Sequence, residues 1–164
     1  MMNNKTLRKR LKKGDFKDIE NWDVSNVTDM NGLFFDEHFS TFDQDISNWD
    51  VSNVTDMRHM FGFCESFNQD ISNWDTSNVE DMAFMFFNAE SFNQDISNWD
   101  VSNVTNMQDM FAYAESFDQD IDDWDVSNVE HMGEMFTCDS ALFKCYDTWQ
   151  TWESRLYKQK GEIK

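Results

Sequence analysis

One phrase recurs five times along this chain of 164 residues and sets a fixed period. A tryptophan stands at the same point of each copy, at Trp22, Trp49, Trp74, Trp99 and Trp124. The spacings are therefore 27, 25, 25 and 25 residues, and four of the five copies read N-W-D-[VT]-S-N-V. A period of this length indicates one supersecondary unit stacked on itself, because a single unit cannot bury its apolar side alone. The repeat predicts an array that presents surfaces rather than enclosing a catalytic pocket.

Two hydrophobic periodicities follow each other inside the third unit, residues 70–94. Trp74 and Thr76 alternate as the inward side chains of a short strand would. The next apolar residues, Val79, Met82, Phe86 and Ala89, fall on one face of a helix. We therefore predict an α/β repeat with one short parallel strand and one short helix per coil. The alternative is an all-β solenoid.

The ends of the chain depart from the repeat and suggest three regions. Residues 1–17 are basic and are expected to form an N-terminal cap, and residues 18–141 hold the five repeat units. Residues 142–164 are expected to contain a partial sixth unit and a C-terminal capping helix, because repeat arrays need covered ends. The first unit is two residues longer between Phe34 and Phe42, which predicts a loop insertion there. We expect a monomer.

Acidic residues dominate the repeats. The net charge is −19, and residues 18–143 contain 28 Asp and Glu against a single base, Arg58. Phosphate binding needs a basic surface, so this composition argues against nucleic-acid binding through the repeats and favours a basic protein partner. No stretch is long and apolar enough to be a membrane span.

The repeated phrase F-[ND]-Q-D-I-S-N-W-D-V-S-N-V-T-[DN]-M resembles that of the BspA-like leucine-rich-repeat bacterial surface proteins, and in particular a repeat of unknown function in Mycoplasma and Listeria lipoproteins. The resemblance covers about residues 19–149. It implies a right-handed leucine-rich-repeat-like solenoid and a role in surface display, adhesion or protein binding. As written, the chain shows no signal peptide or lipobox cysteine, which predicts a cytoplasmic location, whereas the resemblance implies the cell surface.

Stacked units place equivalent residues in columns, and one acidic column lies directly after the tryptophans. If these carboxylates point outward, the sheet face carries a negative stripe that attracts a basic partner. The candidate partner-binding residues are Asp23, Asp50, Asp75, Asp100 and Asp125, flanked by Asn48, Asn73 and Asn98. A solvated or turn-bonded acid row is the plainer interpretation of the same column.

Two further columns have other expected roles. A second acidic column precedes the isoleucines, at Asp18, Asp45, Asp70, Asp95 and Asp120. The alternative function is therefore a structural protein whose aspartate ladders are stabilised by divalent cations such as Ca²⁺, although no recognised metal motif is present. An asparagine column (Asn26, Asn53, Asn78, Asn103 and Asn128) is expected to satisfy backbone groups.

Catalytic motifs are missing from the sequence. His38, His59 and His131 occupy different positions in their units, and none is paired with a nucleophile motif. We therefore expect a non-enzymatic scaffold for protein–protein interaction or adhesion, with no cofactor and no metal site.

Overall fold

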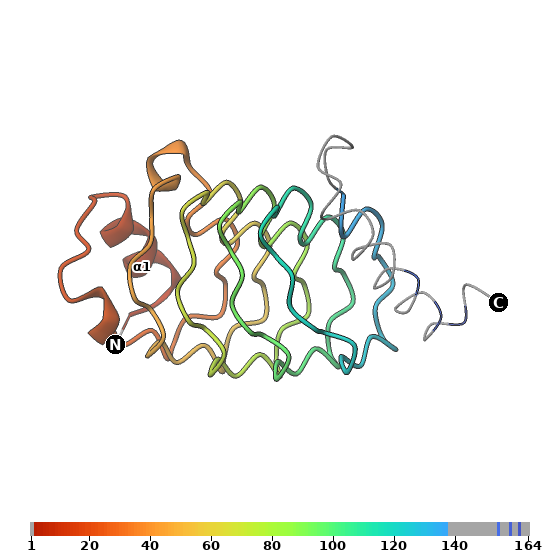
Figure 1. The fold of residues 1–164 in the computed structure, drawn as a ribbon. Helices are drawn as coiled ribbons and strands as arrows, with labels where there is room; N and C mark the ends of the chain where they lie inside the picture. Colours follow the sequence, from red (N-terminus) through yellow and green to blue (C-terminus); the bar gives the residue numbers. More distant parts are fainter. Residues whose placement is uncertain (1, 138–153, 155–157, 159–160, 162–164) are drawn as a thin grey trace.

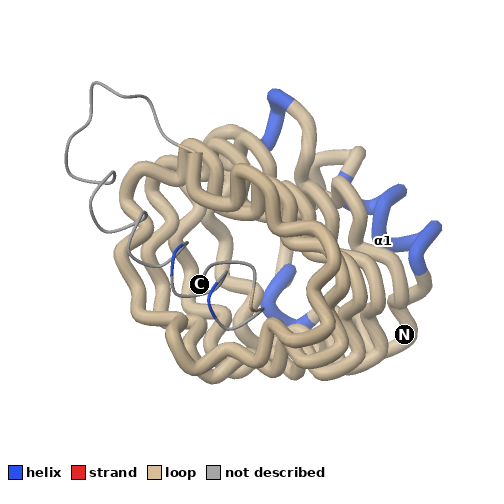
Figure 2. Tube along the Cα trace, turned by 90° about the vertical axis from the view of Figure 1, so that its right-hand side faces the viewer, coloured by secondary structure: helices blue, strands red, loops and turns tan. Residues whose placement is uncertain are grey.

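The computed structural model describes residues 2–137 together with residues 154, 158 and 161. The repeats form successive coils that stack side by side along one axis (Figure 1). Viewed from the end, the coils lie nearly over one another (Figure 2). The predicted sixth unit and C-terminal helix fall in residues 142–164, which lie outside the described residues except for these three positions.

Turns, rather than regular elements, build each coil. The elements of the described residues are the helix α1 (Asn4–Leu11) and two short 3₁₀ helices, η1 (Ile19–Asn21) and η2 (Glu37–Phe39). Neighbouring coils are joined by isolated parallel bridges that link Asp29, Asp56, Asp81, Asn106 and His131 in succession. The prediction of one strand and one helix per coil is therefore wrong, and so is the all-β alternative.

The segment expected to be a helix is a pair of consecutive turns. In the third unit, Met85 N–H donates to the Met82 carbonyl and Ala89 N–H to the Phe86 carbonyl, at 3.1 and 3.0 Å. Phe84, with φ of 58°, interrupts any α-helix, because left-handed backbone does not propagate a right-handed one. Turns four residues apart repeat apolar side chains at nearly the helical interval, which explains the mistaken prediction.

Hydrogen bonds to the next coil take the place of a helical ladder. The N–H groups of His59, Phe61 and Phe63 donate to carbonyl oxygens of residues 83, 85 and 87, at 3.0, 2.9 and 2.8 Å. Every second backbone N–H along this segment thus donates to the next coil. These N–H groups are not available for the bonds to the carbonyl four residues earlier that an α-helix requires.

The segment expected to be a strand also consists of turns. Trp74 N–H donates to the Ile71 carbonyl at 3.2 Å, and Val79 N–H to the Thr76 carbonyl at 2.9 Å. Trp74 and Thr76 are both buried, as the alternation predicts, but turns and not a pleated strand direct them inward. The alternation identified the core positions correctly and the backbone conformation wrongly.

Aromatic columns fill the interior. One phenylalanine per coil stacks on its equivalent in the next coil, with ring centroids 5.5–5.6 Å apart, along Phe34, Phe61, Phe86, Phe111 and Phe136. A second phenylalanine of the same coil lies against it at 4.0 Å, as Phe67 does against Phe61. The Trp99 indole N–H is also satisfied across coils, by the Ile71 carbonyl at 3.1 Å. Each coil is therefore held by its immediate neighbours.

The two extra residues of the first unit leave this register unchanged. Phe34 stacks on Phe61 and Phe42 on Phe67, at 5.5 and 6.1 Å, so the phenylalanines on both sides of the insertion keep their columns. The helix η2 lies between them. The predicted loop insertion is confirmed.

The helix α1 takes the place of a preceding coil. Leu7 and Leu11 are buried in the same core as the first coil. Thr55 N–H donates to the Thr28 carbonyl of the coil before it, at 2.9 Å. No coil precedes the one that contains Thr28, and the Thr28 N–H donates instead to Asn4 Oδ1 of α1, at 2.9 Å. The helix thus satisfies backbone groups that the end of the stack would otherwise expose.

Candidate functional site

The aspartates after the tryptophans each close a small turn. Asp75 Oδ1 accepts the backbone N–H of Ser77 at 3.1 Å and the Ser77 hydroxyl at 2.6 Å. The same backbone hydrogen bond recurs at Asp23, Asp50, Asp100 and Asp125, at 3.0–3.2 Å. Asp and Ser favour this arrangement, in which a side-chain oxygen takes the place of a turn carbonyl. The sequence D-x-S therefore fixes each carboxylate in one orientation.

These carboxylates lie at the surface. All five aspartates of this column are exposed. The hydroxyl and the backbone N–H of the following serine stabilise the anion, and they lower the pKa of Asp23, Asp100 and Asp125 below the ordinary value. The charge of Asp125 opposes this effect at Asp100, so neighbouring carboxylates of the column interact.

Asn48, Asn73 and Asn98 are exposed directly before the tryptophans. Each is separated by one buried tryptophan from an exposed aspartate, so both predicted groups flank the same buried column. No hydrogen bond is formed by these three asparagine side chains within the described residues. The structure therefore places all eight predicted partner-binding residues at the surface.

The other two predicted columns have structural roles. Asp45 Oδ1 accepts from Ser47 N–H, and Asp70 Oδ1 from Ser72 N–H, both at 2.9 Å. Equivalent bonds form at Asp95 and Asp120, so the second acidic column closes turns at these four positions. In the asparagine column, Asn78 Nδ2 donates to the Ser52 carbonyl of the preceding coil at 2.7 Å. Equivalent bonds recur at Asn53, Asn103 and Asn128, which confirms that this column satisfies backbone groups.

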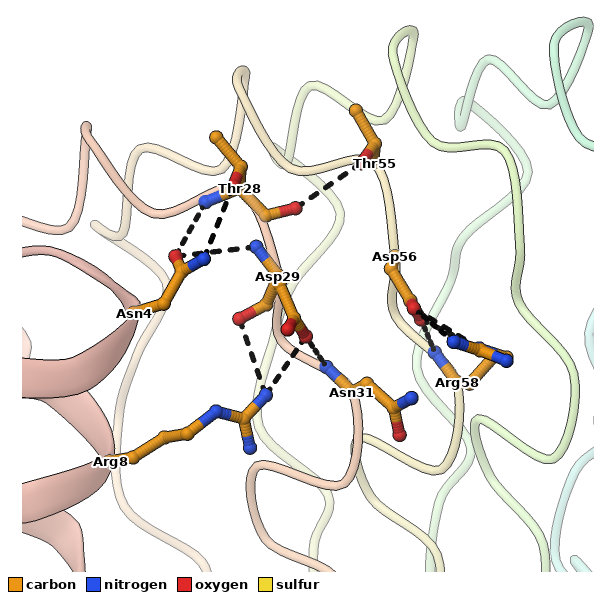
Figure 3. Close-up of polar contacts among 8 residues, drawn as sticks. All are labelled: Asn4, Arg8, Thr28, Asp29, Asn31, Thr55, Asp56 and Arg58. Carbon is orange, nitrogen blue, oxygen red and sulfur yellow. Dashed lines mark hydrogen bonds and ion pairs between the residues drawn. The ribbon is translucent and has the colours of Figure 1, made fainter.

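A third column, which was missed in the sequence, lies at the bridges between coils (Figure 3). This bridge column consists of three aspartates followed by an asparagine and a histidine: Asp29, Asp56, Asp81, Asn106 and His131. Arg8 of α1 donates to Asp29 Oδ1 at 2.9 Å. Arg58 holds Asp56 through Nε and Nη2, at 3.1 and 2.6 Å, and lies 3.7 Å from Asp81 Oδ2. Although burial of Asp56 opposes it, the hydrogen bonds and charge of Arg58 hold the pKa of Asp56 below its usual value. The single basic residue of the repeats was the signal that could have revealed this column.

The aspartate columns do not form a cluster of ligands suited to a divalent cation within the described residues. At Asp70 and Asp75, for example, a turn hydrogen bond already occupies one carboxylate oxygen. Within the described residues, no group of three or more His, Cys, Asp or Glu side chains is placed to hold a metal ion. The described part of the chain also has no helix with the length and apolar character that crossing a membrane requires.

The chain matches one protein-family model, described as "Mycoplasma protein of unknown function, DUF285". The match covers residues 3–100 and again residues 74–160, so the two overlapping matches span both the cap and the repeats. No curated protein and no solved structure matches the chain. The match agrees with the Mycoplasma part of the sequence resemblance and does not extend to the BspA-like leucine-rich-repeat group.

Proposed function

We propose that this chain, which belongs to the DUF285 family of Mycoplasma proteins of unknown function, is a repeat scaffold that binds a basic protein partner. The binding surface is the acidic face, defined as the aspartate column Asp23, Asp50, Asp75, Asp100 and Asp125 with the flanking Asn48, Asn73 and Asn98. The observation that carries the proposal is that every carboxylate of this column is exposed and held in one orientation by its own turn.

Fixed carboxylates favour binding for an entropic reason. A flexible acidic side chain loses rotamer freedom when it pairs with a lysine or arginine, which cancels much of the gain at an exposed site. The Ser77 hydroxyl and N–H have already ordered Asp75, so that loss occurs on folding and not on binding. A row of such groups on successive coils therefore offers a preformed set of negative charges to a basic segment of the partner.

The bridge column and the acidic face differ in their neutralisation. Asp29 and Asp56 of the bridge column are paired with Arg8 and Arg58. Within the described residues, no Lys or Arg pairs with Asp50, Asp75, Asp100 or Asp125, the later four members of the column beside the tryptophans. The acidic face therefore retains the negative potential that attracts a cationic partner.

The direct test is to remove charge from the acidic face while keeping its turns. In an Asp75→Asn/Asp100→Asn variant, the amide oxygen can still accept the serine hydrogen bonds. The chain itself makes this exchange in the bridge column, where Asn106 Oδ1 accepts Gln108 N–H at 3.1 Å. We expect this variant to bind an oligolysine peptide about three- to tenfold more weakly by fluorescence anisotropy, with less difference in high salt.

The matched control is Glu90→Gln/Glu115→Gln. It removes the same charge from two exposed residues that lie elsewhere on the coils. Binding that falls equally in both variants would show that oligolysine senses only net charge, and the acidic face would then not be the site.

Display at the cell surface belongs to the same proposal through the BspA-like resemblance. A protease added to intact cells that produce the chain should then degrade it. Survival of the chain until the cells are lysed would refute surface display and leave the binding proposal untouched.

A further inference from the structure

A second surface of the stack carries aromatic side chains. Six rings in continuous contact cross four coils, and we call them the aromatic row: Phe35, His59, Phe63, Phe84, Phe87 and Tyr113. Ring centroids are 5.5 Å apart from Phe35 to Phe63, 5.3 Å from Phe63 to Phe87 and 5.6 Å from Phe87 to Tyr113. Phe35, Phe63 and Tyr113 are 44%, 42% and 37% exposed, the highest values among large apolar side chains of the described residues.

Several members of the row occupy backbone positions that suit other residue types. Phe63 and Tyr113 have φ of 62° and 60°, which is unfavourable for a bulky L residue and easier for glycine or asparagine. Asn88 occupies the equivalent turn position between them, with φ of 55°. Folding alone therefore favours a small or polar residue at this point, and an exposed aromatic ring there gains little by burial.

A pocket of about 390 Å³ lies at the start of the row. Its lining combines two rings of the row with three acids, and consists of Phe35, Asp36, Glu37, Ser40, Phe63 and Glu65. Asp36 is hydrogen-bonded to His38. The side chains of Glu37 and Glu65 form no ion pair within the described residues, so the pocket keeps negative charge beside its apolar wall.

We infer that the aromatic row and this pocket bind a segment of a partner protein in which apolar side chains accompany lysine or arginine. The apolar residues would lie along the row, and one basic side chain would enter the pocket. Its methylene stem would pack against Phe35 and Phe63 while its charged end approaches Glu37 and Glu65. The chain already holds one basic side chain against an aromatic ring, because the Arg10 guanidinium lies 4.1 Å from the Trp22 ring centroid.

The charge of the surroundings decides against the main competing ligand. Exposed aromatic rows also stack the bases of single-stranded nucleic acid, but such sites track the phosphates with basic residues. Here the pocket is lined by carboxylates, and the repeats carry one arginine. The inference goes beyond the acidic face, because it concerns different side chains and a partner recognised by its apolar content.

The test compares two labelled peptides of equal length and charge, one alternating leucine with lysine and one alternating serine with lysine. We expect the full chain to bind the leucine peptide about tenfold more tightly by fluorescence anisotropy. A Phe63→Asn variant, which suits the backbone at that position, should bring the ratio of the two affinities close to one. The Asp75→Asn/Asp100→Asn variant should bind both peptides more weakly and leave the ratio of their affinities unchanged. This outcome separates the present inference from the proposal for the acidic face.

A second variant perturbs the row without removing a ring. A Cβ added at Gly62 would lie 2.7 Å from Phe35 Cδ2, so Gly62→Ala should displace the Phe35 ring and lower the ratio. Circular dichroism establishes that each variant is folded. Equal affinity of the wild type for both peptides would overturn the inference, as would a ratio that survives both Phe63→Asn and Gly62→Ala. Tighter binding of oligothymidine than of the leucine peptide would also overturn it.

Discussion

Truncation of Phe86 in the middle coil should destabilise the whole stack. The Phe86 ring is fully buried and packs against Phe92 in its own coil, at 4.0 Å between centroids. It also stacks on Phe61 of the preceding coil and Phe111 of the next, both at 5.6 Å. A Phe86→Ala variant therefore loses packing within one coil and across two interfaces.

The expected loss is about 3–5 kcal/mol of unfolding free energy, the usual range for a buried phenylalanine reduced to alanine. Single domains have a total stability of about 5–15 kcal/mol, so this one change removes a large part of it. Phe87 is the matched control, because it is adjacent in sequence but only partly buried. Its contacts are surface rings, and Phe87→Ala should cost about 1 kcal/mol.

Urea unfolding followed by tryptophan fluorescence measures both losses, because the five repeat tryptophans are buried and spread along the stack. Since each coil contacts only its neighbours, Phe86→Ala should also weaken the coupling between the first and last coils and broaden the transition. Equal losses for Phe86→Ala and Phe87→Ala would refute the assignment of Phe86 to a continuous core column.

Three further outcomes follow from the polar contacts. Arg58→Met leaves the partly buried Asp56 without its cation and should cost about 1 kcal/mol in urea unfolding, with a smaller loss in high salt. Asn78→Ala removes a hydrogen bond between coils and should cost about 0.5–1.5 kcal/mol, and Asn78→Asp, which lacks the donor, should not restore it. The folded-state pKa values of Asp23, Asp100 and Asp125 are lowered below 3.8 by their turn hydrogen bonds. Their contribution to stability is therefore present above that pH and is lost as the pH falls through the folded pKa. Thermal melting should therefore be steady near neutral pH and decline below about pH 4, and a melting temperature that rises on acidification would contradict this assignment.

The sequence predicted the stack and its inward side chains because both depend on period alone. The tryptophan spacing gives the register, and the bridges from Asp29 to His131 keep that register through every described coil. The conformation inside the coil was mispredicted, because apolar residues three and four apart fit both a helix and a series of four-residue turns. The positive φ angles that separate these cases fall on residues such as Phe63 and Phe84, which are not typical left-handed residues.

The candidate surfaces were predictable to different degrees. The acidic face follows from a repeated aspartate beside a buried tryptophan, and the D-x-S turn that orders it is a local feature of the sequence. The bridge column and the aromatic row depend on which residues meet across coils. Phe35 and Phe63 come together only because Gly62 leaves room for the Phe35 ring, a contact that no local pattern reveals.

The measurement that tests the acidic face most directly is an NMR titration of the labelled chain with oligolysine. The N–H groups of Ser52, Ser77 and Ser102 are bonded to Asp50, Asp75 and Asp100, so they report on any cation that reaches those carboxylates. We predict that these three amide signals shift together and that the shifts disappear in high salt. Binding that leaves all three amides unmoved would contradict the proposal that this column is the partner-binding surface.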